Sequence, residues 1–217
     1  MKLEEAKLRL EHVINQPFGS LFTKTNHEWV VNKGKAGQVL EIALGLHNSS
    51  APLDFEDGEL KTNKCDANGN PKETVFISQI LSVIDDMFAK KLFEESYLYS
   101  KISNILYVPV CKEGPPKDWK FLTPIHIDIN NPRFERLRLI WRDDYYSICD
   151  QLKHHVETSP DGFIHTSSGL HIQVRSKDSK PYHPIFSRTY GRIVSNKNHA
   201  FYFKKQFVKD IKALALC

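Results

Sequence analysis

Four side chains between residues 41 and 61 have the types and spacing needed to hold a divalent cation beside a phosphate group. Glu41, Asp54 and Glu59 are carboxylates, and Lys61 follows Glu59 by two positions. Mg²⁺ takes oxygen ligands and usually keeps several waters, so two carboxylates and a substrate phosphate suffice to bind it. A cation held in this way polarises the phosphoryl oxygen and acidifies a bound water. The pattern therefore predicts a metal-dependent phosphodiesterase site.

Lys61 is expected to lie beside Glu59, because residues two apart on a strand point to the same face. Its ammonium could then orient the attacking water or stabilise the developing charge. Glu-Leu-Lys tripeptides are also common on solvated surfaces, so an ordinary charged segment is the alternative. Glu41 is the single charge in the apolar run 39–46. A carboxylate is costly to bury unless it is paired or binds a metal; otherwise Glu41 lies on the solvated side of an amphipathic helix.

Hydrophobic spacing and turn residues predict the elements that position these side chains. The expected helices are residues 2–16, 39–46, 133–157 and 204–216. The expected strands are residues 59–65, 74–83, 105–110, 121–129 and 199–203. The strand 105–110 is expected to be central and to stop or bend at Pro109. The stripe of Trp141, Tyr145, Ile148 and Leu152 at helical spacing is expected to be core.

Two hairpins are expected. Asn68-Gly69 favours a tight turn that would pair strand 59–65 with strand 74–83. The second hairpin covers residues 162–174, turning at Ser167-Ser168-Gly169, and the polar residues 175–190 after it are expected to form a loop. Such a loop is either solvated or enters the major groove of DNA, where an arginine can bond guanine.

From residue 33 onward, several segments occur in an order that resembles the MutH-like endonucleases. This family includes the strand-nicking enzyme of methyl-directed mismatch repair and GATC-cutting type II restriction enzymes. The segments that carry the resemblance are KGKAGQVLEIALG, DF, GELKT, an Asn-Gly turn, NPKETVF, SKISNILYVPV, IWRDDYYSICDQL, LHIQVRSKD and GRIVSNKNHAFYFKKQFVKDIKAL.

The resemblance implies catalytic roles for five residues. Asp54, Glu59 and Lys61 match the catalytic Asp, Glu and Lys, with Asp54 and Glu59 as the Mg²⁺ ligands. Glu41 matches a helix glutamate that supports the metal site. Lys101 matches a lysine near the scissile phosphate.

The resemblance also implies a DNA-binding set. Arg175 and Lys177 match a pair that contacts bases and backbone in the recognition loop. Phe76 and Tyr202 match aromatic positions near the recognised adenine. Lys204, at the start of the expected C-terminal helix, suits a phosphate contact, although it could equally be an ordinary solvated charge.

The spacing departs from the repair enzyme at one point. The interval from Asp54 to Glu59 is shorter than is usual, and Asp57-Gly58 replaces apolar residues. Either the strand starts later or a turn absorbs the deletion. This departure weakens the assignment to the repair branch and favours a type II restriction enzyme.

Composition agrees with a globular DNA-binding protein. The chain has 217 residues, 41% of them hydrophobic, which is enough for one large domain or two tightly joined lobes. We expect a single endonuclease domain over residues 1–217. The net charge of +4 is compatible with DNA binding.

Cysteine and hydropathy patterns restrict the class further. The four cysteines form no Cys-x-x-Cys pair, so zinc is not expected, and the histidines are scattered. No apolar run has membrane-spanning length, and the charged start MKLEEAKLRL does not resemble a signal peptide. A cytoplasmic protein without membrane contact is expected.

The sequence therefore predicts an α/β protein with a restriction-endonuclease-like core, in which helices flank a central mixed sheet and two lobes form a DNA cleft. The predicted activity is sequence-specific, Mg²⁺-dependent cleavage of double-stranded DNA at GATC, as in type II restriction. One alternative is methyl-directed mismatch-repair nicking, and the partners would then be repair proteins rather than a modification system. An alternative of another class is a catalytically inactive DNA-binding module.

Overall fold

The computed structural model describes residues 1–22, 35–46, 53–177 and 180–215, which form a mixed α/β fold. Contacts divide the chain into two compact units. Unit 1 consists of Met1–Val75, Ser103–Asp128 and Val208–Cys217, and unit 2 consists of Phe76–Ile102 and Ile129–Phe207. Within the described part of the chain, no helix combines the length and apolar character needed to cross a bilayer.

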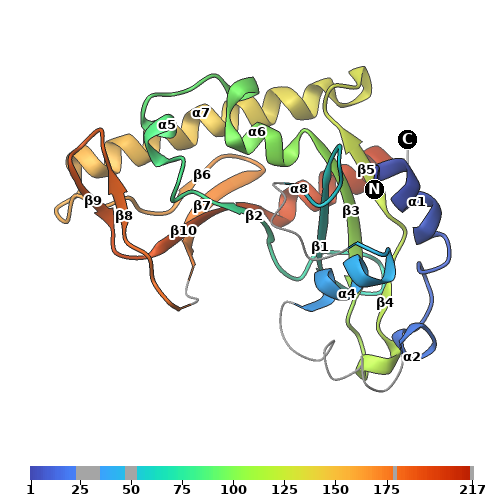
Figure 1. The fold of residues 1–217 in the computed structure, drawn as a ribbon. Coiled ribbons are helices and arrows are strands. Elements are labelled where there is room, and N and C mark those ends of the chain that lie inside the picture. Colours follow the sequence, from blue (N-terminus) through green and yellow to red (C-terminus); the bar gives the residue numbers. More distant parts are fainter. Residues whose placement is uncertain (23–34, 47–52, 178–179, 216–217) are drawn as a thin grey trace. The chain divides into compact units, whose positions relative to one another are not determined.

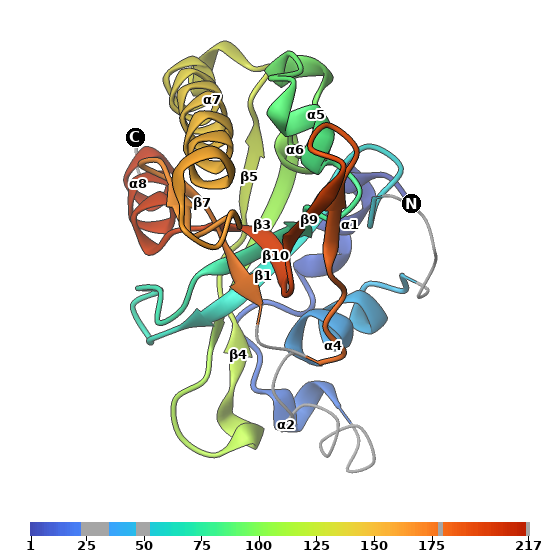
Figure 2. The same ribbon diagram turned by 90° about the vertical axis from the view of Figure 1, so that its left-hand side faces the viewer.

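The sheet of unit 1 is mixed and has β3 (Asn104–Cys111) at its centre. β1 (Glu59–Cys65) pairs with β3 in parallel. β4 (Lys120–Phe121) and β5 (Ile125–Asp128) pair with β3 antiparallel, and β3 and β5 run side by side in Figure 2. All of β3 after its first residue is buried, as expected of an apolar central strand.

The described residues of unit 1 include the short helices α1 (Leu3–Leu10), α2 (Phe18–Leu21) and α4 (Lys35–Ala43). Their apolar side chains join those of β1, β3 and β4 in one hydrophobic core. α1 ends at Leu10, earlier than the predicted 2–16, because the chain turns there and Asn15 adopts a positive φ of 61°. α4 begins earlier than the predicted 39–46 and ends at Ala43.

Unit 2 contains a second sheet, in the order β2 (Val75–Gln79), β10 (Asn198–Phe203), β7 (Ile172–Lys177) and β6 (Ser167–Ser168). The long helix α7 (Glu135–Thr158) runs along it (Figure 1). The predicted core stripe on this helix is confirmed, since the four residues Trp141, Tyr145, Ile148 and Leu152 are buried.

The remaining elements are short. Unit 2 also has α5 (Ile84–Phe88), α6 (Tyr97–Ile102) and the hairpin of β8 (Ile185–Ser187) and β9 (Arg192–Ser195). α8 (Lys205–Ala215) begins in unit 2 and continues into unit 1. Three 3-10 turns complete the described chain: η1 (Phe93–Glu95), η2 (Pro116–Asp118) and η3 (Pro132–Phe134).

The predicted hairpin between strands 59–65 and 74–83 is wrong. β1 pairs with β3, and β2 pairs with β10 in the other sheet. The tight turn itself is present: Gly69 has a φ of +73° and donates its N–H to Asp66 O at 2.9 Å. The chain reverses only as far as an isolated bridge between Cys65 and Pro71. The N–H of Lys72 still donates to Lys64 O at 2.9 Å, but the N–H of Lys64 donates to the side chain of Glu73 at 2.9 Å and not to a backbone carbonyl, and the two segments then separate.

Two strand boundaries also differ from the prediction. β3 continues through Pro109 to Cys111, and Pro109 lies where its antiparallel partner changes from β5 to β4. The predicted strand 121–129 is divided into β4 and β5 around Pro124. Each of these prolines lacks a backbone N–H, but it lies between two short stretches of strand pairing, where no donor is needed.

The second predicted hairpin exists, but its turn lies later. Ser167 and Ser168 form β6, so the turn comprises Gly169 to His171. β7 then runs to Lys177, and β8 forms within the predicted loop 175–190. Arg175 therefore lies inside a strand, opposite Ala200 of β10, and not at the start of a loop.

Candidate active site

Glu59 and Lys61 form a close ion pair on one face of β1. The ammonium of Lys61 lies 2.5 Å from Glu59 Oε2, and the two side chains are only 11% and 4% exposed. Strand alternation places them on the same face, as the sequence predicts. A carboxylate buried to this extent requires a charged or hydrogen-bonding partner, and Lys61 supplies one.

Asp54 is brought to this pair by a turn. The N–H of Phe55 donates to Gly58 O at 2.9 Å, and the N–H of Leu60 donates to Asp54 Oδ2 at 2.9 Å. Asp54 Oδ2 consequently lies 4.0 Å from Lys61 Nζ. A Cβ on Gly58 would lie 2.8 Å from Asn104 O, so this turn has no room for a larger residue. The turn absorbs the short interval between Asp54 and Glu59.

Glu41 is placed near the same charges by the packing of α4 on β1. Gly37 approaches the strand closely, since a Cβ there would lie 3.5 Å from Thr62 Oγ1. Glu41 is half-buried, and burial raises its pKa; the negative charge of Asp54 adds to this rise and the positive charge of Lys61 opposes it. Glu41, Asp54 and Lys61 therefore interact electrostatically.

The donor set fits a hard cation. Asp54 and Glu59 supply carboxylate oxygens at 4.0 and 2.5 Å from the Lys61 ammonium, and oxygen donors with room for water and phosphate suit Mg²⁺. Among the described residues, no group of three or more His, Cys, Asp or Glu side chains is arranged to hold a metal. A cation here would therefore rely on two carboxylates and on oxygens from substrate or water.

Asn63 is a further polar residue on the same face of β1 that sequence reasoning missed. It is buried, accepts a hydrogen bond from the hydroxyl of Tyr107 and donates to Glu73 O at 3.2 Å. Tyr107 stands opposite Lys61 in the β1–β3 register. The sequence signal that could have revealed Asn63 is its position two residues after Lys61, which places it on the same face as Glu59 and Lys61. A buried asparagine on that face needs hydrogen-bond partners on a neighbouring strand.

Four of the predicted DNA-binding residues gather on one face of the sheet in unit 2, here called the reading face: Phe76, Arg175, Lys177 and Tyr202. The guanidinium of Arg175 lies 4.3 Å from the centre of the Tyr202 ring, and Lys177 Nζ lies 5.0 Å from that of Phe76. The two rings pack edge to face at 5.6 Å. Two cations over two aromatic rings are typical of nucleic-acid contacts.

Strand alternation explains why the reading face is solvated. Arg175 is exposed, whereas the preceding residue, Val174, is fully buried on the opposite side of β7. That opposite side packs against α7, where the Trp141 ring lies 5.1 Å from Phe203. The sheet therefore has one core face and one face that carries cations and aromatic rings.

Lys204 lies apart from the other predicted DNA-binding residues. It precedes α8, and its ammonium donates to Gly169 O at 2.8 Å. It is only partly exposed. The ammonium is thus hydrogen-bonded to a backbone carbonyl of the turn before β7.

Comparison with known proteins adds independent evidence. A family model described as "DNA mismatch repair enzyme MutH" matches residues 45–138. DNA mismatch repair protein MutH of Citrobacter koseri is 28% identical over 191 residues, covering 84% of this chain and 77% of that protein. The protein of the same name from Buchnera aphidicola is 32% identical over 102 residues, or 45% of each chain. The chain is thus similar to the MutH-like DNA endonucleases.

The family match covers only some of the residues predicted to form the sites of this protein. Asp54, Glu59 and Lys61 lie within residues 45–138, and so does Lys101. Lys101 belongs to α6 in unit 2, and its ammonium lies 5.6 Å from the Tyr97 ring centre. Its predicted contact with the scissile phosphate stays a prediction.

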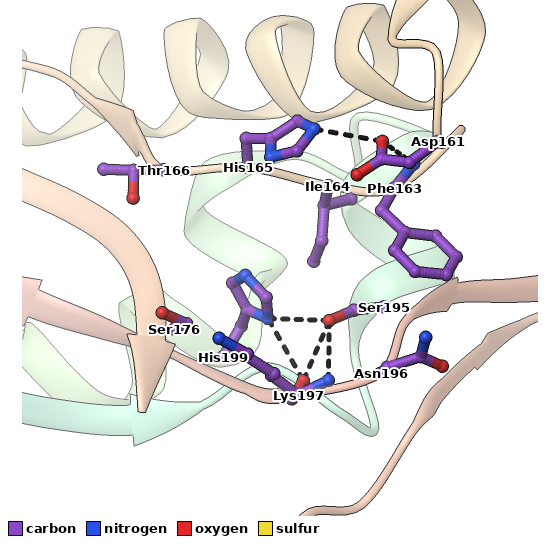
Figure 3. Close-up of a pocket in the computed structure, with 10 residues that line it drawn as sticks. All are labelled: Asp161, Phe163, Ile164, His165, Thr166, Ser176, Ser195, Asn196, Lys197 and His199. Carbon is purple, nitrogen blue, oxygen red and sulfur yellow. Dashed lines mark hydrogen bonds and ion pairs between the residues drawn. The ribbon is translucent and has the colours of Figure 1, made fainter. Parts of the chain in front are cut away.

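The protein also has a polar cavity of about 350 Å³ in unit 2 (Figure 3). His165 points toward Asp161, with 3.1 Å between Nε2 and Oδ1, and His199 faces Ser195, with 3.1 Å between Nδ1 and Oγ. Burial lowers the pKa of His199. These side chains satisfy one another, and their arrangement does not indicate a particular ligand.

Proposed function

We propose that this protein is an endonuclease that hydrolyses a phosphodiester bond of double-stranded DNA, with Mg²⁺ held by Asp54 and Glu59. The observation that carries the proposal is the buried pair of Glu59 and Lys61 with Asp54 beside it, on one face of β1. When bound, the cation would supply Lewis acidity toward the phosphoryl oxygen and lower the pKa of a water.

The residues of the chain have separate tasks in this proposal. Lys61 orients the attacking water or stabilises the charge that develops on the phosphate. Because the ammonium now contacts Glu59, binding of a cation would free it for this task. Glu41 adds negative charge next to Asp54, which favours a cation at the site. Lys101 is proposed to contact the scissile phosphate.

The reading face is proposed to recognise the DNA sequence. Arg175 can form a bidentate bond with guanine, which typically contributes about 1–3 kcal/mol of discrimination. Phe76 and Tyr202 would pack near the recognised adenine, and Lys177 would contact the backbone. The family resemblance suggests GATC as the recognised sequence, within a fold of the restriction-endonuclease type.

The role we favour is strand nicking in mismatch repair. Both relatives described above are named DNA mismatch repair proteins, and this supports repair more than the type II restriction role that the short Asp54–Glu59 interval favoured. The turn of Phe55 to Gly58 accommodates that interval without displacing Asp54 from Lys61. Repair proteins are accordingly the proposed partners. Restriction at GATC is the second candidate, since the interval still differs from the repair enzyme.

Plasmid cleavage by Lys61→Ala tests the proposal. Loss of the ammonium should lower the rate of Mg²⁺-dependent cleavage by about 10²–10³-fold, the usual effect of removing one charge-stabilising donor. Chelation with EDTA should abolish cleavage by the unsubstituted protein. The measurement is conversion of supercoiled plasmid to nicked or linear product, with binding of the same DNA followed in parallel.

Lys64→Ala is the matched control, because Lys64 is exposed on the same strand and points to the other face. It should cut at the unsubstituted rate. If Lys61→Ala cuts as fast as this control, the active site lies elsewhere. If the unsubstituted protein binds DNA but never cuts it with Mg²⁺, the chain is an inactive DNA-binding module.

A further inference from the structure

A buried carboxylate from the middle of α7 binds the turn that begins β7. Asp144 is 5% exposed. Its Oδ1 accepts the N–H of Leu170 at 2.6 Å, and its Oδ2 accepts the N–H groups of His171 and Ile172 at 2.7 and 2.8 Å. Three backbone donors on one carboxylate are charge-assisted bonds, which are shorter and stronger than neutral ones.

Lys204 binds the same turn from the end of β10. Its ammonium donates to Gly169 O at 2.8 Å, and its backbone N–H donates to His171 O at 2.7 Å. The turn closes on itself through the bond from the N–H of Gly169 to Ile172 O at 2.8 Å. Asp144 of α7 therefore binds backbone N–H groups of the turn, and Lys204, after β10, binds its backbone carbonyls.

This arrangement requires a glycine at position 169, because a larger residue would collide with Asp144. A Cβ at this position would lie 2.0 Å from Asp144 Oδ1 and 2.3 Å from its Cγ, distances at which no side chain can be accommodated. We call Asp144, Gly169 and Lys204 the turn clamp. All three belong to unit 2, as does the reading face.

The turn clamp holds the first residue of β7, and the pairing of this residue sets the register of β7 against β10 on the reading face. Ile172, the first residue of β7, pairs with Phe203, the residue before Lys204. Counting along the same ladder, Gln173 pairs with Tyr202 and Arg175 with Ala200, which sets Arg175 over the Tyr202 ring. A slip of one residue would move every side chain of β7 to the other face.

We propose that Asp144 and Lys204 are positioning residues for DNA recognition: by fixing the start of β7 against β10, they set where Arg175 meets its base. This inference rests on the proposed role of the reading face. It assigns Lys204 to the turn and not to a DNA phosphate. Neither residue touches the DNA in this proposal; both act through Arg175.

The experiment measures cleavage and competition binding on a cognate GATC duplex and on one with a single changed base. Asp144→Asn keeps the shape but replaces one accepting oxygen with a donor that faces backbone N–H groups. Lys204→Met keeps the chain length and removes the ammonium. Each should lower the preference for the cognate duplex by about tenfold, within the range of one lost bidentate contact. Salt-sensitive binding to the changed duplex should stay the same.

Controls and a double-variant cycle separate positioning from general stability. Asp143→Asn, whose side chain is 75% exposed on the same helix, and Lys209→Met, exposed on α8, should keep the full preference. In an Arg175→Ala background, Asp144→Asn and Lys204→Met should cost no further preference, because the residue through which they act is gone. Should Asp144→Asn fail to fold, Lys204→Met carries the same test.

The outcomes distinguish the two levels of the proposal. If Arg175→Ala keeps full preference for GATC, the proposed reading face is wrong. The positioning role is overturned if Arg175→Ala loses the preference but Asp144→Asn and Lys204→Met keep it. It is also overturned if Asp144→Asn and Lys204→Met lower the affinity for both duplexes equally, and if this loss adds to that of Arg175→Ala. Equal weakening on both duplexes by Lys204→Met alone would restore Lys204 as a phosphate contact.

Discussion

Apart from Lys101, the residues proposed for catalysis are close together in sequence, and this is why local patterns could predict them. Glu59 and Lys61 need only strand alternation to meet, and their ammonium and carboxylate are 2.5 Å apart. Asp54 depends on a tight turn before the strand, which Asp57-Gly58 made plausible. The helix residue Glu41 meets them through packing, so its charge environment could be found only in the structure.

A trade-off between stability and activity is expected at Glu41. Burial and the Asp54 charge raise its pKa, which means that the folded protein holds this proton more tightly than the unfolded chain does. Ionisation of Glu41 therefore destabilises the fold progressively as pH rises from the ordinary value of 4.5 through the raised pKa. Glu41→Gln should melt at a higher temperature than the unsubstituted protein at pH 7 in EDTA, and cut DNA more slowly with Mg²⁺.

Melting curves between pH 4 and pH 8 check the sign of this effect, since the difference should vanish below pH 4.5, where Glu41 is protonated in both states. Glu95→Gln, an exposed substitution in unit 2, is the control and should change neither property. A Glu41→Gln protein that melts and cuts like this control would place Glu41 on an ordinary solvated helix face.

At the scale of elements, the sequence predicted which segments are strands better than which strands pair. Strands β1, β3 and β10 lie near their predicted bounds. For the apolar strands β3 and β10 this is because burial leaves a local hydrophobic signature. Pairing is not local: the Asn68-Gly69 turn forms, yet β2 leaves for another sheet. Arg175 was placed in a loop because the residues after Val174 are polar, whereas β10 extends the ladder to Lys177.

Arg175→Ala should reduce preference for the cognate site by roughly 5- to 150-fold, corresponding to the 1–3 kcal/mol of a bidentate arginine–guanine contact. Its place inside β7, with the guanidinium 4.3 Å from the Tyr202 ring, holds the side chain on the reading face before DNA binds. Lys177→Ala should instead weaken cognate and scrambled duplexes equally and reduce the salt dependence. Competition binding at two salt concentrations measures both effects, and a uniform loss for Arg175→Ala would make it a backbone contact.

The carboxylate of Asp85, in α5, binds the turn of the β8–β9 hairpin. Burial alone would raise the pKa of Asp85, but bonds from the Ser187 hydroxyl and from the N–H groups of Arg188 and Thr189 outweigh it and lower the pKa. A lowered pKa stabilises the fold above the ordinary value of 3.8, and this stability is lost as pH falls through the folded pKa. Asp85→Asn should lower the free energy of unfolding at pH 7 by about 1–3 kcal/mol.

Urea unfolding at pH 7 and pH 3 tests this expectation, with Asp86→Asn as control. Asp86 is the exposed neighbour of Asp85, and its carboxylate lies 3.7 Å from the surface ammonium of Lys91. The difference between the Asp85 and Asp86 variants should shrink at the lower pH. An equal loss of stability at both pH values would point to packing and not to the carboxylate charge.

At the scale of the whole molecule, the proposed tasks are divided between the two units. Asp54, Glu59 and Lys61 belong to unit 1, and the reading face belongs to unit 2. The order of family-like segments along the sequence predicted both sets without revealing this division, because each unit is assembled from separated stretches of chain. We propose that residues 1–217 act as a single endonuclease domain, in which both sets of residues serve the same DNA duplex.

The product formed on differently methylated plasmids should separate the two proposed roles. A mismatch-repair endonuclease should nick the unmethylated strand of hemimethylated GATC sites, slowly alone and faster with a repair partner, and leave fully methylated plasmid intact. A restriction enzyme should convert unmethylated plasmid to linear fragments without any partner. Both activities should disappear in Lys61→Ala and with EDTA, which ties the product to the site on β1. Sequencing of the cut ends identifies the recognised sequence. Linear fragments from the protein alone would reject the repair role that we favour, and cuts away from GATC would reject the recognition sequence while leaving the active site in place.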